Sequence, residues 1–276
     1  MPDIVEAAIL GIVQGLTEFL PISSTGHLVI VEKALGISQD EFGLPFDAAI
    51  HLGTLAAVLV YFRGTMRQLV TGWFQSLRRR DWQATPHSRL AWLLLLGTVP
   101  AGLAGLALES TAEDAFRSPA LVAAMLIVFC LPLLAAERWG RRQRDALNVT
   151  PVDALVIGVA QGVALIPGVS RSGITISAGM LGGFRRDEAA VFAFLLSAPV
   201  IALAGGKQVF DIVTGADDAG RDYAVYGVGL LTAAVVGYAA IAFLLRFLRV
   251  RSLAAFIVYR VGLGALVLAL AAAGQI

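Results

Sequence analysis

Long apolar segments separated by short polar ones run along the whole chain, and this pattern predicts helices that cross a membrane. Each segment is bounded by charged residues and is close to the roughly 20 residues that a helix needs to span the hydrocarbon core. The six predicted spans are residues 45–62, 90–108, 119–136, 187–208, 224–246 and 252–274. Two other apolar segments, 4–35 and 152–183, are broken in the middle by proline and glycine.

The composition agrees with a membrane protein. Hydrophobic residues make up 58% of the chain and the mean hydropathy is +0.78, whereas soluble domains are about half apolar. We therefore expect an all-α polytopic membrane protein that forms one integral membrane domain over residues 1–276. The net charge of +1 gives no sign of a nucleic-acid partner, and we expect none.

The basic residues predict the orientation of the spans, because short cytoplasmic loops are enriched in lysine and arginine. Fifteen of the 21 basic residues fall in the loops 63–89, 137–150, 185–186 and 246–251, which we place on the cytoplasmic side. Segment 152–183 then enters and leaves the membrane on that side, as a re-entrant helix-loop-helix hairpin. By the same logic, the other broken segment re-enters from outside, and both chain termini lie outside.

An internal repeat supports this arrangement. Gly11-Ile-Val-Gln14-Gly15 is echoed by Gly158-Val-Ala-Gln161-Gly162, and Ser23-Ser24-Thr25-Gly26 by Ser170-Arg171-Ser172-Gly173, with a constant offset of 147 residues. The two halves, about 1–136 and 151–276, are therefore expected to be related by inverted topology. The predicted fold is six transmembrane helices plus two re-entrant hairpins in an inverted-topology repeat.

The broken centres of the two hairpins are the predicted site. Pro21 and Pro167 mark where the ingoing half-helices stop, and the outgoing half-helices begin near Thr25 and Ser172. Non-helical backbone is tolerated at bilayer depth only where it lines a cavity or is buried in protein. Helix N-termini that point into such a cavity favour an anion. Capping alone would use one or two of the loop hydroxyls, and these loops carry more.

Two charged side chains sharpen this interpretation. A guanidinium at the depth of Arg171 is costly unless it is paired, and its planar fork matches phosphate or carboxylate. The alternative for Arg171 is a structural salt bridge to Glu18. Glu18 lies one helical turn after Gln14, and it is predicted either to hold a divalent cation, Mg²⁺ or Ca²⁺, or to act as a general base. The residues alone leave these roles open.

Histidines and a second arginine complete the candidates. His27, two residues after Thr25, is predicted to transfer a proton or to attack phosphorus. The evidence for His51 is evenly balanced between lining the cavity and simple helix packing. Arg260, deep in the last span, is expected to pair with an acidic or carbonyl group. The glycine-rich segments 227–229 and 262–264 permit close helix packing and a homodimer.

Two motifs carry a family resemblance. Gln14-Gly-Leu-Thr-Glu18-Phe-Leu-Pro21-Ile-Ser23-Ser24-Thr25-Gly26-His27 and Pro167-Gly-Val-Ser170-Arg171-Ser172-Gly173 resemble the signature motifs of the bacterial undecaprenyl pyrophosphate phosphatases of the bacitracin-resistance type. The resemblance covers essentially the whole chain. It implies hydrolysis of undecaprenyl pyrophosphate to the monophosphate with a divalent cation, which recycles the lipid carrier for cell-wall synthesis and confers bacitracin resistance.

The resemblance also implies where the protein is located, and it shows one position at which this chain differs from many members of the family. The enzyme would lie in the bacterial inner membrane, with its site and both termini on the periplasmic side. Members of that family often carry Glu at the position of Gln14. Because Gln14 has no charge, we expect it to position a neighbouring group or to form a hydrogen bond with it. That leaves Glu18 as the only acid of the motif and the one possible metal ligand in it.

We hypothesise that the lipid pyrophosphate head enters between the two loops. Ser24 is the preferred nucleophile, activated by Glu18 or His27, and direct attack by His27 is the alternative. Arg171 would hold phosphoryl oxygens. The other predicted substrate-binding residues are Gln14, Ser23, Thr25, Gly26, Ser170, Ser172 and Gly173. The rival function is a lipid flippase or a secondary transporter of an anionic substrate, since carriers also build sites from facing half-helices.

Overall fold

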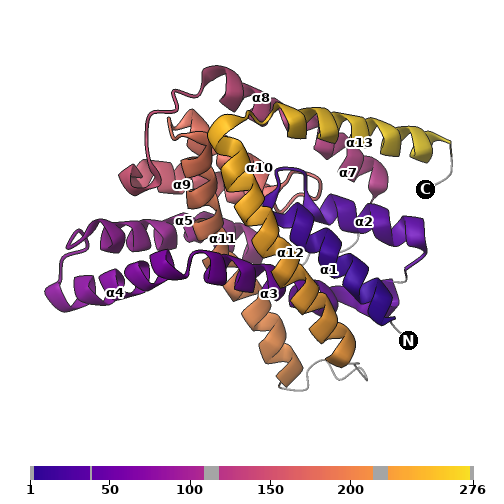
Figure 1. Ribbon diagram of the computed structural model, residues 1–276, viewed down its shortest axis with the longest axis horizontal. Helices are drawn as coiled ribbons and strands as arrows, with labels where there is room; N and C mark the ends of the chain where they lie inside the picture. The colour runs from indigo at the N-terminus through magenta and orange to yellow at the C-terminus, as the bar shows by residue number, and fades with distance from the viewer. Residues whose placement is uncertain (1–2, 38, 109–117, 214–222, 274–276) are drawn as a thin grey trace.

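The computed structural model describes residues 3–37, 39–108, 118–213 and 223–273, and within these ranges the regular structure is helical apart from one isolated β-bridge. Figure 1 labels the elements along the chain. They are α1 (Ile4–Phe19), α2 (Ser24–Leu35), α3 (Gln39–Tyr61), α4 (Arg63–Arg79), α5 (Pro86–Leu108), α7 (Pro119–Val128), α8 (Cys130–Trp139), the 3₁₀ turn η1 (Ala146–Asn148), α9 (Pro151–Val163), α10 (Arg171–Leu181), α11 (Arg186–Val213), α12 (Tyr223–Val250) and α13 (Ala254–Ala272).

Five helical segments in the described ranges are long and apolar enough to cross a membrane. They are Pro86–Ala107, Pro119–Trp139, Arg186–Gly206, Tyr223–Val250 and Ala254–Ala272. The predicted span 45–62 corresponds to α3, which qualifies only when Phe46–Tyr61 is taken together with α4. The chain is therefore a multi-pass membrane protein, with five or six candidate spans in the described ranges. Residues 109–117 and 214–222, which connect predicted spans, lie outside the described residues.

The segment 63–89, which the sequence suggested was a charged loop, contains a helix. α4 bends by 83° away from Phe46–Tyr61. Leu69 and Trp73 pack with the core, and Trp92 of α5 donates a hydrogen bond to Ser76 at 2.9 Å. The many arginines lower the mean hydropathy of this segment, although it forms an amphipathic helix whose apolar side packs on α5.

Both broken segments form two helices separated by an irregular turn. Each ingoing helix ends before its proline, at Phe19 and at Val163. Ser23 and Ser170 precede the outgoing helices, and both have a φ of 73°, which is uncommon for residues other than glycine. The two loops therefore turn in the same way at the 147-residue offset.

The ingoing helices pack closely against long helices from elsewhere in the chain. α1 lies along α12, and α9 lies along α5. A Cβ on Gly11 would come within 2.5 Å of the Gly229 carbonyl oxygen, and a Cβ on Gly158 would collide with the carbonyl oxygen of Gly97. Glycine at these equivalent positions therefore permits the close approach of backbone to backbone.

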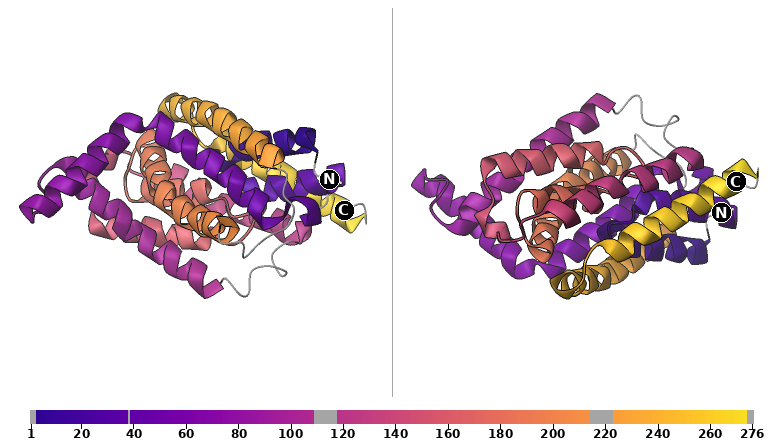
Figure 2. Two further views of the ribbon diagram at one scale, coloured as in Figure 1. Left: turned by 90° about the horizontal axis from the view of Figure 1, so that it is seen from below. Right: turned by 90° about the horizontal axis from the view of Figure 1, so that it is seen from above.

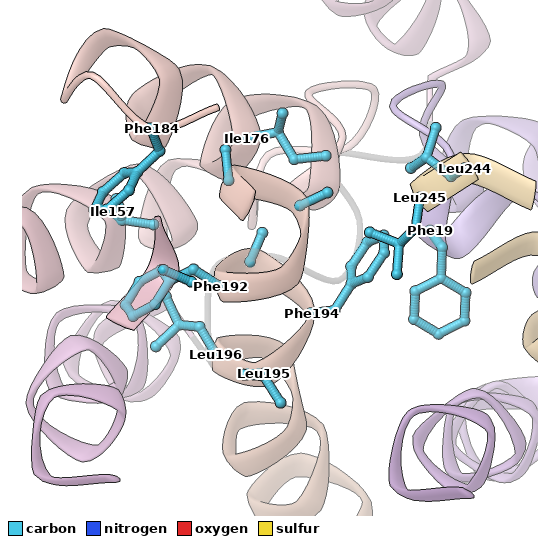
Figure 3. Packing of buried hydrophobic residues seen from close by; sticks show 14 of the residues in the cluster. Phe19, Ile157, Ile176, Phe184, Phe192, Phe194, Leu195, Leu196, Leu244 and Leu245 are labelled. Atoms are coloured by element: carbon cyan, nitrogen blue, oxygen red, sulfur yellow. The ribbon is translucent and has the colours of Figure 1, made fainter. Parts of the chain in front are cut away.

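The hydrophobic core fixes the end of α1 against α11. Phe19 and Phe194 are buried, and their rings meet edge to face with centroids 5.2 Å apart. Figure 3 shows this pair on one side of α11, with Phe192, Ile157 and Phe184 on the other side. Because Phe19 follows Glu18 directly, this packing also positions the Glu18 carboxylate.

The start of α1 and the end of α13 lie at one end of the molecule, and the turn between α4 and α5 lies at the opposite end (Figure 2).

Candidate active site

The two irregular loops meet inside the protein. The Ser172 hydroxyl at the start of α10 donates a hydrogen bond to the Leu20 carbonyl oxygen at 2.9 Å. Arg171 forms an ion pair with Glu18, which the sequence offered as the alternative to phosphate binding. The pair joins residues 153 positions apart, so the hairpin tips are in direct contact.

The Arg260 guanidinium donates hydrogen bonds to both loops. Its side chain is fully buried, and its donors reach carbonyl oxygens on three segments. Nη1 donates to Pro21 at 3.3 Å in the first loop, and Nη2 donates to Gly168 at 3.0 Å and Val169 at 3.2 Å in the second. Nε donates to Leu126 of α7 at 3.0 Å. The prediction that Arg260 pairs with an acidic or carbonyl group is confirmed.

A cavity of about 130 Å³ lies where the loops meet. Residues from the first loop, the second loop, α3, α9 and α11 line it together. The lining includes six of the predicted site residues, Glu18, Ser23, Ser24, Thr25, Ser170 and Arg171, together with His51, Gln161 and Gly168. Helices α2 and α10 both begin at this cavity, so the positive ends of two helix dipoles lie beside it.

Glu18 is the centre of the hydrogen-bond network at the cavity. One carboxylate oxygen, Oε1, accepts from Arg171. The other, Oε2, accepts from the Ser24 hydroxyl at 2.6 Å and from the Gln14 amide at 3.1 Å. His51 Nε2 lies 3.9 Å from the same oxygen. The Glu18 side chain is 4% exposed, so its negative charge is stabilised by these donors rather than by bulk water.

The two candidate histidines are placed differently. His27 Nδ1 lies 2.7 Å from the Ser23 carbonyl oxygen and Nε2 lies 2.7 Å from the Tyr259 hydroxyl. Since a carbonyl only accepts, Nδ1 carries a proton and a neutral His27 accepts from Tyr259. His51 Nδ1 is held in the same way by the Asp47 carbonyl at 2.7 Å, and its ring lines the cavity. The cavity lining therefore includes His51 and not His27.

Several predicted site residues lie around the cavity without lining it. Gln14 is fully buried behind Glu18. The amides of Gly26 and Gly173 donate to the Ser23 and Ser170 hydroxyls at 3.4 and 3.2 Å, so these two serines are helix caps. Ser172 borders a small recess next to Glu18 and Arg171.

Sequence reasoning did not select Gln161 as a site residue. The sequence repeat contains Gln161, and in the structure this residue is 2% exposed and lines the cavity. The sequence did contain a signal for Gln161, because it lies 147 residues after Gln14 and Gln14 belongs to the first motif.

In the part of the chain that the structure describes, no three His, Cys, Asp or Glu side chains gather into a group that could hold a metal ion by itself. Glu18 is the one acid at the cavity, and its two oxygens already accept hydrogen bonds. Mg²⁺ commonly binds through one or two carboxylates plus the phosphates of a substrate. The single carboxylate of Glu18 therefore fits a cation whose other ligands include the phosphate groups of a bound substrate.

The chain is similar to known proteins over nearly its whole length. The family model described as bacitracin resistance protein BacA matches residues 7–266. An undecaprenyl-diphosphatase from Rubrobacter xylanophilus is 48% identical over 271 residues, which are 98% of this chain and 99% of the relative. An undecaprenyl-diphosphatase from Thioalkalivibrio sulfidiphilus is 45% identical over 96% of this chain and 98% of the relative. Another from Myxococcus xanthus is 46% identical over 99% of this chain and 91% of the relative. With a match that extends over nearly its whole length, the chain belongs to the BacA bacitracin resistance protein family.

Proposed function

We propose that this protein hydrolyses undecaprenyl pyrophosphate to undecaprenyl phosphate and inorganic phosphate. The observation that carries the proposal is the Ser24 hydroxyl, bonded to the buried Glu18 carboxylate at 2.6 Å, in a cavity that also contains Arg171. This set combines a nucleophile, a proton acceptor and an anion-binding group. The relatives named undecaprenyl-diphosphatases support the choice of substrate.

Binding of the pyrophosphate head follows from charge and geometry. The hydrogen bond to Glu18 uses Nη2 of Arg171, and the same guanidinium lines the cavity, so its remaining donors can hold phosphoryl oxygens. The positive ends of α2 and α10 add to this attraction. Phosphoryl transfer depends mostly on such positioning and charge neutralisation.

The chemistry would proceed in two steps. The Ser24 oxygen attacks the terminal phosphorus, Glu18 takes the hydroxyl proton, and the bond from that phosphorus to the bridging oxygen breaks, so that undecaprenyl phosphate leaves. Water then hydrolyses the phosphoserine, which releases phosphate and restores the Ser24 hydroxyl. The observed contact of Ser24 is with Glu18, which favours Glu18 over His27 as the base. His27 would instead support the first loop through Ser23 and Tyr259.

A divalent cation, Mg²⁺ or Ca²⁺, fits this scheme. Glu18 would hold it together with the phosphates of the substrate, and the cation would neutralise charge on the pyrophosphate.

We also propose the finer topology of six spans and two re-entrant hairpins, related by inverted topology, in the bacterial inner membrane with the site open to the periplasm. The matching turns at Ser23 and Ser170 and the matching glycine contacts of α1 and α9 support it. A cysteine placed at Gln83, in the exposed turn before α5, should react with a membrane-impermeant reagent only after cells are opened. Labelling of intact cells would contradict the proposed orientation.

The polyprenyl tail has a suitable groove beside the cavity. An apolar groove of about 390 Å³ lies between α3, α4, α5 and α11. Leu55 of the groove is one turn after His51 of the cavity, and Val200 of the cavity follows Pro199 of the groove. A lipid whose head occupies the cavity could therefore extend its tail along the groove. Homodimer formation stays a prediction.

The groove predicts a dependence on tail length. Leu59→Trp would fill the groove and raise KM for undecaprenyl pyrophosphate, but not for a short-chain farnesyl pyrophosphate. Leu103→Trp, at an exposed position of α5 outside the groove, is the matched control. An equal effect of Leu59→Trp on both substrates would place the tail elsewhere.

Phosphate release from undecaprenyl pyrophosphate in detergent tests the function itself. Arg171→Ala should abolish release while the folded protein remains extractable, and Arg246→Ala, at an exposed site on α12, should not. The wild-type measurement also decides against a flippase or transporter alone, because detergent offers no membrane to cross. Absence of phosphate release from the wild-type protein would reject the phosphatase.

A further inference from the structure

Gln161 has a buried side-chain amide without a hydrogen-bond partner among the residues that the structure describes. It lies on α9, is 2% exposed, and lines the cavity with Glu18, Ser24 and Arg171. Within the described residues, neither its Oε1 nor its Nε2 forms a hydrogen bond. Nearly all buried polar groups in folded proteins are paired, and an unpaired one is unfavourable. Packing alone therefore does not explain a glutamine at this position.

The repeat shows what is different about Gln161. Its counterpart in the first hairpin, Gln14, donates from Nε2 to Glu18 at 3.1 Å. Glu18 lies four residues after Gln14, but the residue four positions after Gln161 is Leu165. The second hairpin thus keeps the amide and lacks the carboxylate that would accept from it. Gln161 borders the cavity, and within the described residues no protein oxygen accepts a hydrogen bond from its N–H donors.

We propose that Gln161 is a substrate-binding residue whose amide N–H groups donate to a phosphoryl oxygen of the pyrophosphate head. The phosphoryl oxygen would take the place that the Glu18 oxygen has beside Gln14. The proposal rests on the proposed phosphatase function, since it assigns a further contact to the same site. The amide is neutral, so it adds hydrogen bonds without adding to the charge supplied by Arg171.

Substrate binding and a structural role predict opposite results for Gln161→Met, which keeps the length of the side chain and removes its polar atoms. Without ligand, the variant should melt at or above the wild-type temperature, because an unpaired buried amide has been removed. Its kcat/KM for undecaprenyl pyrophosphate should fall by about 10- to 100-fold, as expected for a lost hydrogen bond to a charged group. Gln75→Met, at an exposed position of α4, is the matched control and should leave both unchanged.

A second variant and a second readout keep the test decisive. Gln161→Glu places a negative charge against the phosphate and should reduce kcat/KM more than Gln161→Met does. Inorganic pyrophosphate should raise the melting temperature of the wild-type protein, and this shift should be reduced in both variants.

The outcomes separate the two proposals. Full activity of Gln161→Met, or a lowered melting temperature with an unchanged pyrophosphate shift, would overturn the assignment and leave the phosphatase function intact. If the wild-type protein released no phosphate, the phosphatase function would fail. A pyrophosphate shift that depends on Gln161 would then still support Gln161 as an anion-binding residue.

Discussion

Arg260 should be required both for stability and for the shape of the site. Arg260→Met keeps much of the side-chain volume but removes every donor to the loop carbonyls. Three of the lost hydrogen bonds, to Leu126, Gly168 and Val169, are 3.2 Å or shorter. Each bond to a charged group contributes about 1.5–3 kcal/mol, which gives a gross loss of roughly 4–9 kcal/mol.

The net loss is smaller because the substitution also removes a buried charge. Desolvation of an ion in a protein interior costs several kcal/mol, and this cost disappears with the guanidinium. We expect a net destabilisation of roughly 3 kcal/mol, which corresponds to about 6–10 °C in melting temperature for a chain of this size. Arg260→Lys should give an intermediate value, because a single ammonium nitrogen cannot reach both loops.

Activity should fall further than stability suggests. Pro21 and Gly168 belong to different loops, and Arg260 contacts both. A displacement of about 1 Å between reacting groups can lower the rate about 100-fold, so phosphate release should fall by that order at a temperature where the variant is folded. Thermal unfolding and phosphate release in detergent are the two assays, with Arg246→Met on the exposed face of α12 as control. Wild-type stability and activity in Arg260→Met would refute this reasoning.

Three further predictions follow from the site and the packing. A phosphoenzyme trapped during turnover should carry its label on Ser24, and label confined to His27 would exclude the serine mechanism. Chelation of divalent cations should abolish phosphate release and added Mg²⁺ should restore it, whereas unchanged activity in excess chelator would remove the cation from the scheme. Gly158→Ala should lower the melting temperature because its Cβ would collide with the backbone of α5. Gly102→Ala, whose Cβ would meet nothing within 4 Å, should be neutral or slightly stabilising by up to about 1 kcal/mol, and equal losses in both would argue against the close contact.

Much of the fold could be predicted from local properties of the sequence. Apolar length determines which segments become spanning helices, and the breaks near Pro21 and Pro167 determine where the two hairpins turn. The repeat of Ser23 at Ser170 also has a local consequence, because each serine caps the helix that follows it. The helix α4 was missed because its arginines lowered the hydropathy of a segment whose apolar residues have helical spacing.

Only the tertiary structure decided which polar groups share the site. Glu18 and Arg171 are 153 positions apart, and no pattern in the sequence distinguishes their ion pair from two separate roles. His51 and Gln161 reach the cavity because α3 and α9 pack beside the loops, while the ring of His27 turns toward Tyr259. Helix formation depends on neighbouring residues and can be recognised along the chain. Contacts between loops depend on how whole helices pack, and that packing is determined by the sum of many distant contacts.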